Sequence, residues 1–258
     1  MANILEGLNI IVTGGAQGLG LGMARNFAHH GAKVFLLDKN ITLARSAAAL
    51  LPGDGHMAVE CDVTIPELRH TALSEVIKAA GNIDVLVNNA GITHIQPAEE
   101  MDEEKWREVF EVNVHGMMFM SREVAGYMLK KGSGSIINIG SITSLVGFPR
   151  RSVYTTCKTA VIGLTRSLAI EWAQRGIRVN AIGPGYHETD LFRKYVNNGL
   201  IDEERIRKRI PMGRLGSIDD VGRAAVFFAS GLSRYVTGQF MMVDGGYTAF
   251  GAAEDASV

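Results

Sequence analysis

Short apolar runs alternate with helix-like segments along most of the chain, and this alternation limits the possible fold more than any other feature. We expect strands at residues 9–13, 33–37, 56–60, 84–88, 135–139 and 178–182. We expect helices at residues 18–30, 41–50, 66–80, 102–130 and 152–174. Because strand–helix–strand units repeat and several of the strands are apolar throughout, the sequence predicts a doubly wound parallel sheet with helices on both faces.

The length and charge of the chain favour one compact enzyme domain over residues 1–258. The chain has 258 residues, of which 47% are hydrophobic, and 26 Lys and Arg against 27 Asp and Glu. This near-neutral balance argues against nucleic acid and against an anionic membrane surface as partners. Residues 1–7 lack the pattern of a secretion signal, and no apolar run approaches membrane-spanning length, so we expect a soluble, unprocessed protein.

The two cysteines indicate a reducing setting. Cys61 and Cys157 are far apart and show neither CxxC nor Cys/His spacing, which argues against a disulfide framework and a metal site. We therefore expect a cytoplasmic protein without a metal.

Residues 189–216 differ from the rest of the chain because they are rich in charge and lie between two strand–helix units. We interpret them as a small helical insertion that covers a substrate site. The alternative is a solvated amphipathic surface helix, and for the charged run 203–209 alone this alternative is the better one.

A glycine-rich turn follows the first expected strand, with the sequence Thr13-Gly14-Gly15-Ala16-Gln17-Gly18-Leu19-Gly20. Glycine lets the backbone approach a pyrophosphate closely, and the N-terminus of the next helix offers free N–H groups. The alternative is a tight turn without a ligand. In this context the motif favours a dinucleotide site.

Asp38 ends the second expected strand, 18 residues after Gly20. At this spacing a carboxylate accepts hydrogen bonds from an adenosine ribose and repels the extra phosphate of NADP. Lys39 softens the repulsion, but no arginine stands beside Asp38, so NAD is the expected cofactor. The alternative role for Asp38 is a helix cap.

Ser141, Tyr154 and Lys158 form the candidate catalytic set. Tyr154 and Lys158 are four residues apart at the start of an expected helix, and Ser141 follows the strand before it. A nearby ammonium favours the phenolate, so Lys158 would let Tyr154 exchange a proton near neutral pH. A Tyr–Lys pair alone is weak, because a solvated helix face produces most such spacings.

The motifs together resemble the short-chain dehydrogenase/reductase family, whose order and distances they follow over nearly the whole chain. The resemblance rests on residues 13–20, Asn88-Asn89-Ala90-Gly91, Asn113, Ser141, Tyr154 with Lys158, and Pro184-Gly185. It implies a Rossmann fold, a homotetramer, and a catalytic set of Asn113, Ser141, Tyr154 and Lys158. It implies a cofactor site made of Gly14, Gln17, Gly18, Leu19, Gly20, Asp38, Asp62, Val63, Asn89, Ala90, Gly91, Tyr154, Lys158, Pro184, Gly185 and Thr189.

The expected reaction is hydride transfer between a secondary alcohol and a ketone, or between a sugar hemiacetal and a lactone, with NAD(H). We expect a polar substrate similar to a sugar or polyol. We also expect an anionic group on it, more than for the substrate of an average family member. The residues behind this expectation are Ser141, Thr143, Tyr154, His94, Arg150, Arg151 and His187. Surface roles for His187, Arg150 and Arg151 stay open. The alternatives are a 3-oxoacyl-chain or other small-ketone reductase and, outside enzymes, a nucleotide-sensing regulator.

Overall fold

A seven-stranded parallel sheet forms the centre of the molecule in a computed structural model, which describes residues 3–252. The strand order is β3-β2-β1-β4-β5-β6-β7, and every neighbouring pair is parallel. The strands are β1 (Asn9–Thr13), β2 (Lys33–Asp38), β3 (Met57–Glu60), β4 (Val85–Asn88), β5 (Gly134–Ile139), β6 (Ile177–Pro184) and β7 (Phe240–Val243). The predicted doubly wound parallel sheet is confirmed. Residues 1–2 and 253–258 of the predicted domain lie outside the described residues.

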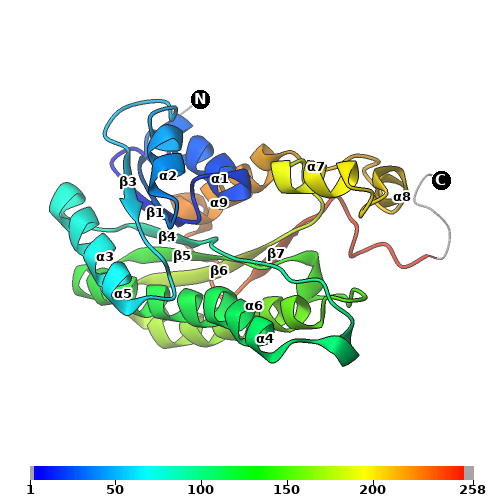
Figure 1. Ribbon diagram of the computed structural model, residues 1–258. Coiled ribbons are helices and arrows are strands. Elements are labelled where there is room, and N and C mark those ends of the chain that lie inside the picture. Colours follow the sequence, from blue (N-terminus) through cyan, green and yellow to red (C-terminus); the bar gives the residue numbers. More distant parts are fainter. Residues whose placement is uncertain (1–2, 253–258) are drawn as a thin grey trace.

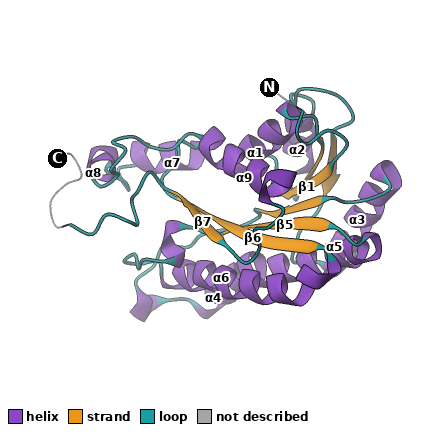
Figure 2. Ribbon diagram, turned by 180° about the vertical axis from the view of Figure 1, so that it is seen from behind, coloured by secondary structure: helices purple, strands orange, loops and turns teal. Residues whose placement is uncertain are grey.

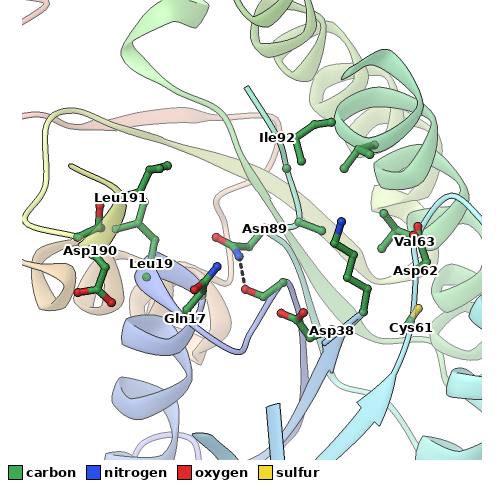
Figure 3. A pocket seen from close by; sticks show the side chains of 18 of the residues that line it. Gln17, Leu19, Asp38, Cys61, Asp62, Val63, Asn89, Ile92, Asp190 and Leu191 are labelled. Carbon is green, nitrogen blue, oxygen red and sulfur yellow. Dashed lines mark hydrogen bonds between the residues drawn. The ribbon is translucent and has the colours of Figure 1, made fainter. Parts of the chain in front are cut away.

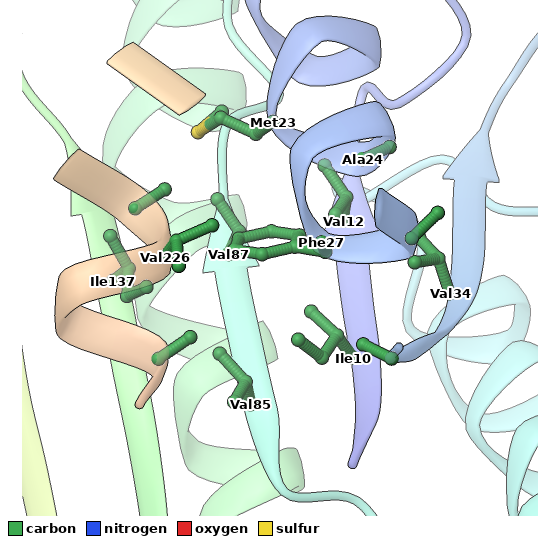
Figure 4. Packing of buried hydrophobic residues seen from close by; sticks show 14 of the residues in the cluster. Ile10, Val12, Met23, Ala24, Phe27, Val34, Val85, Val87, Ile137 and Val226 are labelled. Atoms are coloured by element: carbon green, nitrogen blue, oxygen red, sulfur yellow. The ribbon is translucent and has the colours of Figure 1, made fainter. Parts of the chain in front are cut away.

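Helices cover both faces of this sheet (Figures 1 and 2). One face carries α1 (Gly18–His29), α2 (Ile41–Ala48) and α9 (Ile218–Ala229), and the other carries α3 (Pro66–Ala80), α5 (Met117–Lys131) and α6 (Ser152–Trp172). Figure 4 shows the hydrophobic core between the sheet and the first of these helix layers, where Phe27 of α1 lies among Val12, Val87 and Val34. Because the strands are buried on both sides, their apolar runs are continuous rather than alternating.

The sheet has a switch point between β1 and β4. β1 pairs with β2 on one side and with β4 on the other, so the connections after these neighbouring strands leave in opposite directions. In an open parallel sheet a crevice forms at such a point, beyond the carboxyl ends of the strands. The glycine-rich turn after β1 and the Asn-Asn-Ala-Gly segment after β4 both lie at this edge.

The expected helix over residues 102–130 is present, but it is not α-helical throughout. The structure has α4 (Glu103–Phe110), a π-helical segment (Glu111–Gly116) and then α5. Asn113 lies inside the π-helical segment, fully buried, and its amide donates to the carbonyls of Val109 and Ile92 and accepts from the Ile92 N–H. The wider turn therefore lets Asn113 hydrogen-bond with the loop after β4, as π-segments at functional sites often do.

The insertion after β6 contains α7 (Asp190–Asn197) and α8 (Glu203–Lys208). Arg193 bonds to both Glu188 and Glu203, and Arg207 also bonds to Glu203. These ion pairs tie the two short helices to the loop that precedes them. Within residues 3–252, no helix has the length and apolar character needed to cross a bilayer.

Candidate active site

The turn after β1 is built so that its backbone can lie close to the end of β4. Gly14 and Gly18 have φ values of 59° and 56°, in the left-handed region that favours glycine. The Asn89 amide donates to the carbonyl of Gly14 at 2.9 Å, and a Cβ on Gly20 would collide with that same carbonyl. Around Gly18, in contrast, a Cβ would meet nothing within 4 Å, so this backbone faces open space.

A cavity of about 620 Å³ lies over this turn and across the switch point (Figure 3). Asp38, at the end of β2, accepts from the N–H groups of Ala16 and Asn40, and Asp62 accepts from Thr64. Figure 3 shows Asp38 and Asp62 on one side of the cavity, with Leu191 of the insertion on the other. The cavity is lined by Gly14, Gln17, Gly18, Leu19, Gly20, Asp38, Lys39, Cys61, Asp62, Val63, Asn89, Ala90, Gly91, Ile92, Val112, Thr189, Asp190, Leu191 and Lys194.

These residues fit a nicotinamide dinucleotide. Glycine backbone and the N-terminus of α1 face the space where a pyrophosphate would bind, and Asp38 reaches the same space with a carboxylate suited to a ribose diol. Of the predicted cofactor residues, Tyr154, Lys158, Pro184 and Gly185 are not among the residues that line this cavity. In the described part of the chain, no three His, Cys, Asp or Glu side chains converge as metal ligands do.

Three of the four predicted catalytic residues, Ser141, Tyr154 and Lys158, lie close together beside this cavity. Ser141 caps the 3₁₀ turn Ile142–Ser144 after β5, and Tyr154 and Lys158 lie in the first two turns of α6. The Lys158 ammonium lies 5.6 Å from the centre of the Tyr154 ring. Burial raises the pKa of Tyr154, whereas a hydrogen bond with Ser141 and the charge of Arg151 lower it.

Lys158 is the most constrained of the three. Its side chain is buried, with 4% exposed, and its Nζ donates to the Ile139 carbonyl at 2.8 Å. Burial penalises the ammonium and lowers the pKa of Lys158 to about 8. An effect of Lys158 on the Tyr154 phenolate, as inferred from the sequence, remains a prediction.

A second cavity, of about 200 Å³, opens beside Tyr154 and shares Leu19, Thr189 and Leu191 with the first. Of the predicted substrate residues, Ser141, Thr143, Tyr154, Arg151 and His187 line it, and His94 and Arg150 do not. The other lining residues are Thr93, Ile142, Phe148, Gly185, Tyr186, Phe192, Tyr195 and Ile201.

The two substrate residues outside this cavity have other contacts. His94 bonds to the side chain of Gln96, and Arg150 is exposed with a φ of 63°, which is rare outside glycine. Arg151, the next residue, extends a guanidinium nitrogen to 3.3 Å from the Thr93 hydroxyl, at the cavity wall. Of the two neighbouring arginines, Arg150 is thus exposed outside the cavity and Arg151 lies at its wall.

The sequence reasoning missed the aromatic part of the substrate cavity. Tyr186 packs edge-on against Phe192 and Tyr247, and Phe148 stacks on Tyr247. Burial raises the pKa of Tyr186 to about 12, so its hydroxyl stays protonated. The position of Tyr186 directly after Pro184-Gly185 was the available signal for a residue at the carboxyl end of β6.

A family model described as enoyl-(acyl carrier protein) reductase matches residues 14–248, which include the glycine turn, Ser141, Tyr154 and Lys158. The chain belongs to the short-chain dehydrogenase/reductase family. Galactitol 2-dehydrogenase (L-tagatose-forming) of Cereibacter sphaeroides is 40% identical to it over 246 residues, which are 95% of this chain and 96% of the relative. The 2-dehydro-3-deoxy-D-gluconate 5-dehydrogenase of Bacillus subtilis (strain 168) is 40% identical over 245 residues, 94% of this chain and 95% of the relative.

Solved structures of family members agree with this assignment. A gluconate 5-dehydrogenase from Burkholderia cenocepacia J2315, in complex with NADP and tartrate, is 36% identical, covers 96% of this chain and 98% of its own, and superposes with a TM-score of 0.89. A 3-ketoacyl-(acyl-carrier-protein) reductase from Brucella melitensis, complexed with NADH, is 34% identical with a TM-score of 0.88 over 95% of this chain and 99% of its own. This short-chain dehydrogenase/reductase is therefore an oxidoreductase for alcohols or ketones that uses a nicotinamide cofactor.

The buried Lys158 predicts an unusual dependence of stability on pH. Between about pH 8 and 10.5 the unfolded chain keeps the lysine proton and the folded protein releases it, so the parent protein gains stability as pH rises. We expect Lys158→Met to be more stable than the parent at pH 7, with an advantage that shrinks toward pH 10.5. Urea unfolding at both pH values measures this difference. A constant difference, or a less stable variant at pH 7, would contradict the assignment of a buried ammonium.

Proposed function

We propose that the protein is an NAD(H)-dependent oxidoreductase that interconverts a secondary alcohol and a ketone, or a sugar hemiacetal and a lactone, on a sugar- or polyol-like substrate. The observation that carries the proposal is the junction of the two cavities. Ser141 and Tyr154 line the smaller cavity, and Leu19, Thr189 and Leu191 are shared with the larger one. A substrate in the smaller cavity would thus lie against a dinucleotide in the larger one, with the insertion 189–216 covering both.

Each residue of the candidate catalytic set has its own role in the proposed reaction. Tyr154 takes the proton of the substrate hydroxyl during oxidation and returns it during reduction. Ser141 holds the substrate oxygen and hydrogen-bonds the Tyr154 hydroxyl, while Lys158 adds a positive charge near the phenol ring. Asn113 fixes the loop after β4 that lies along the cofactor. A nicotinamide cofactor held by the residues of the larger cavity would supply the hydride chemistry.

The polar side chains of the smaller cavity support a hydroxylated substrate. The Thr143 hydroxyl and the Nε2 atom of His187 are buried without a hydrogen-bond partner among the described residues. Buried polar groups of this kind normally have partners, and substrate hydroxyls would supply them. The rings of Tyr186 and Phe148 offer apolar surface to the C–H groups of a sugar chain.

Arg151 supports an anionic group on the substrate. Its guanidinium lies at the cavity wall and has, among the described residues, no carboxylate partner within ion-pair distance. A guanidinium binds a carboxylate through two parallel hydrogen bonds, so a sugar acid fits this wall better than a neutral polyol. Two of the relatives named above act, by their names, on gluconate-type acids, and one acts on galactitol.

A 3-oxoacyl-chain or other small-ketone reductase is the second candidate, since the Brucella melitensis neighbour has that activity by its title. The polar groups of the smaller cavity favour a sugar or polyol substrate over an oxoacyl chain. A nucleotide-sensing regulator needs no intact Ser141, Tyr154 and Lys158, whereas this chain keeps all three. A homotetramer and a cytoplasmic location remain proposals, the latter supported by two unpaired, buried cysteines.

A substrate screen tests the proposed function. The purified protein is given NAD⁺ with neutral sugars, polyols, sugar acids, sulfonated sugars and hydrophobic secondary alcohols, and NADH formation is followed. We expect the highest kcat/KM with a sugar acid. Preference for steroids or aliphatic alcohols would contradict the polar cavity, and NADH binding without any turnover would favour the regulator.

Asp38 should determine the choice of cofactor. Its carboxylate would accept hydrogen bonds from the ribose diol of NAD and would repel the 2′-phosphate of NADP. We expect the parent to prefer NAD by more than about tenfold in kcat/KM, and Asp38→Ala to narrow this preference by about tenfold, or about 1.4 kcal/mol. Equal kcat/KM with both cofactors in the parent would refute the NAD assignment, and Lys39 would then be the first residue to examine.

Arg151 and Arg150 provide a matched pair for the anionic substrate. Arg151→Ala should raise KM for a sugar acid about tenfold or more, because one charge-assisted contact is worth about 1.5–3 kcal/mol. Arg150→Ala removes the same charge from an exposed position outside the cavity and should leave KM near the parent value. Steady-state kinetics at two salt concentrations measures both. Equal KM changes in the two variants would show that Arg151 acts only through the general charge of the loop.

A further inference from the structure

The Ser144 hydroxyl joins the two segments that carry the catalytic residues. Its Oγ accepts a hydrogen bond from the backbone N–H of Ser141 at 3.2 Å and donates one to the backbone carbonyl of Lys158 at 2.7 Å. Ser144 is buried, with 5% of its surface exposed, so water does not compete for these bonds. One side-chain oxygen therefore bonds directly to the backbones of two catalytic residues.

The Ser141 side chain depends on the same short turn. Its Oγ accepts from the N–H of Thr143 at 3.1 Å, which leaves its one hydrogen for the bond with the Tyr154 hydroxyl that lowers the pKa of Tyr154. Two other hydrogen bonds connect α6 to this region, but one is longer and the other reaches β5 rather than the turn. Thr159 reaches the Ser144 carbonyl at 3.4 Å, and the Lys158 Nζ bonds to Ile139 at the end of β5. Neither of these contacts fixes the Ser141 backbone.

We propose that Ser144 is a positioning residue that fixes the register between Ser141 and the helix that carries Tyr154 and Lys158. Without its hydroxyl, the buried N–H of Ser141 loses its partner, and of the described hydrogen bonds between this turn and α6 only the longer one from Thr159 remains. A shift of about 1 Å in a catalytic group can reduce turnover by about 10²-fold. The proposal rests on the proposed dehydrogenase function, because the register matters only if Ser141 and Tyr154 act on one substrate atom.

Two serine-to-alanine variants test this role against a merely structural one. Ser144→Ala removes the bridge. Ser135→Ala is the matched control, because Ser135 is equally buried in β5 and its hydroxyl bonds to the Phe228 carbonyl, at the amino end of the strand and away from the cavities. Ser144→Thr keeps the hydroxyl and Ser144→Val replaces it with a methyl of similar shape, so this second pair decides the question if Ser144→Ala does not fold.

The kinetic readout separates positioning from stability. We expect kcat to fall about tenfold or more in Ser144→Ala and Ser144→Val, to recover in Ser144→Thr, and to stay at the parent value in Ser135→Ala. The KM for the cofactor should be unchanged in all four. A parent-like kcat in Ser144→Ala, or equal losses in Ser144→Ala and Ser135→Ala, would overturn the proposal.

A second readout needs no turnover and so separates this proposal from the proposed function. The ultraviolet phenolate titration of each protein, minus that of its Tyr154→Phe counterpart, reports the pKa of Tyr154 with saturating NAD⁺ or NADP⁺. Because the Ser141 hydrogen bond favours the phenolate, we expect this pKa to be higher in Ser144→Ala than in the parent and in Ser135→Ala. Equal values in all three would overturn the role of Ser144. If the parent converts no alcohol or ketone but these shifts occur, the proposed function fails and the positioning role stands.

Discussion

All seven strands run in the same direction, and the rest of the structure depends on this constraint. Parallel strands place their carboxyl ends at one edge of the sheet, so the segments after β1, β2, β4, β5 and β6 meet there. The chain connections after β1 and β4 leave in opposite directions, which opens a crevice at that edge. The glycine turn after β1 and the Asn89 amide after β4 hydrogen-bond to each other there. Residues more than a hundred positions apart in the chain thereby form one site.

The candidate site contains closely packed glycines and a buried lysine. A Cβ on Gly20 would collide with the Gly14 carbonyl, a Cβ on Gly14 would lie very close to the Ala90 backbone, and the Lys158 side chain is removed almost entirely from water. Such burial is unfavourable for an ammonium, and it is offset by the hydrogen bond to the Ile139 carbonyl and by the nearby Tyr154 ring. Enzymes commonly give up stability in this way to hold a functional group in place. The insertion, with its ion pairs, contributes Thr189 and Leu191 to both cavities.

The sequence predicted the parts of the site that follow from local rules. Strand ends, the glycine turn and the four-residue spacing of Tyr154 and Lys158 are local patterns, and the structure brings these residues together. The π-helical turn at Asn113, inside the expected helix, was not predictable in this way, because it is stabilised by bonds to Ile92, 21 residues away in the sequence. The two arginines also looked equivalent. In the structure Arg150 has a left-handed backbone conformation, which no local pattern encodes, and Arg151 rather than Arg150 lines the cavity.

The central claim is that Tyr154 transfers the proton of the reaction while the larger cavity holds the cofactor. The most direct test is to measure both properties in Tyr154→Phe, which removes the phenol oxygen and keeps the ring. The account predicts that the Kd for NADH stays close to that of the parent, while kcat falls by about 10²-fold or more. A near-parent kcat in this variant would contradict the account.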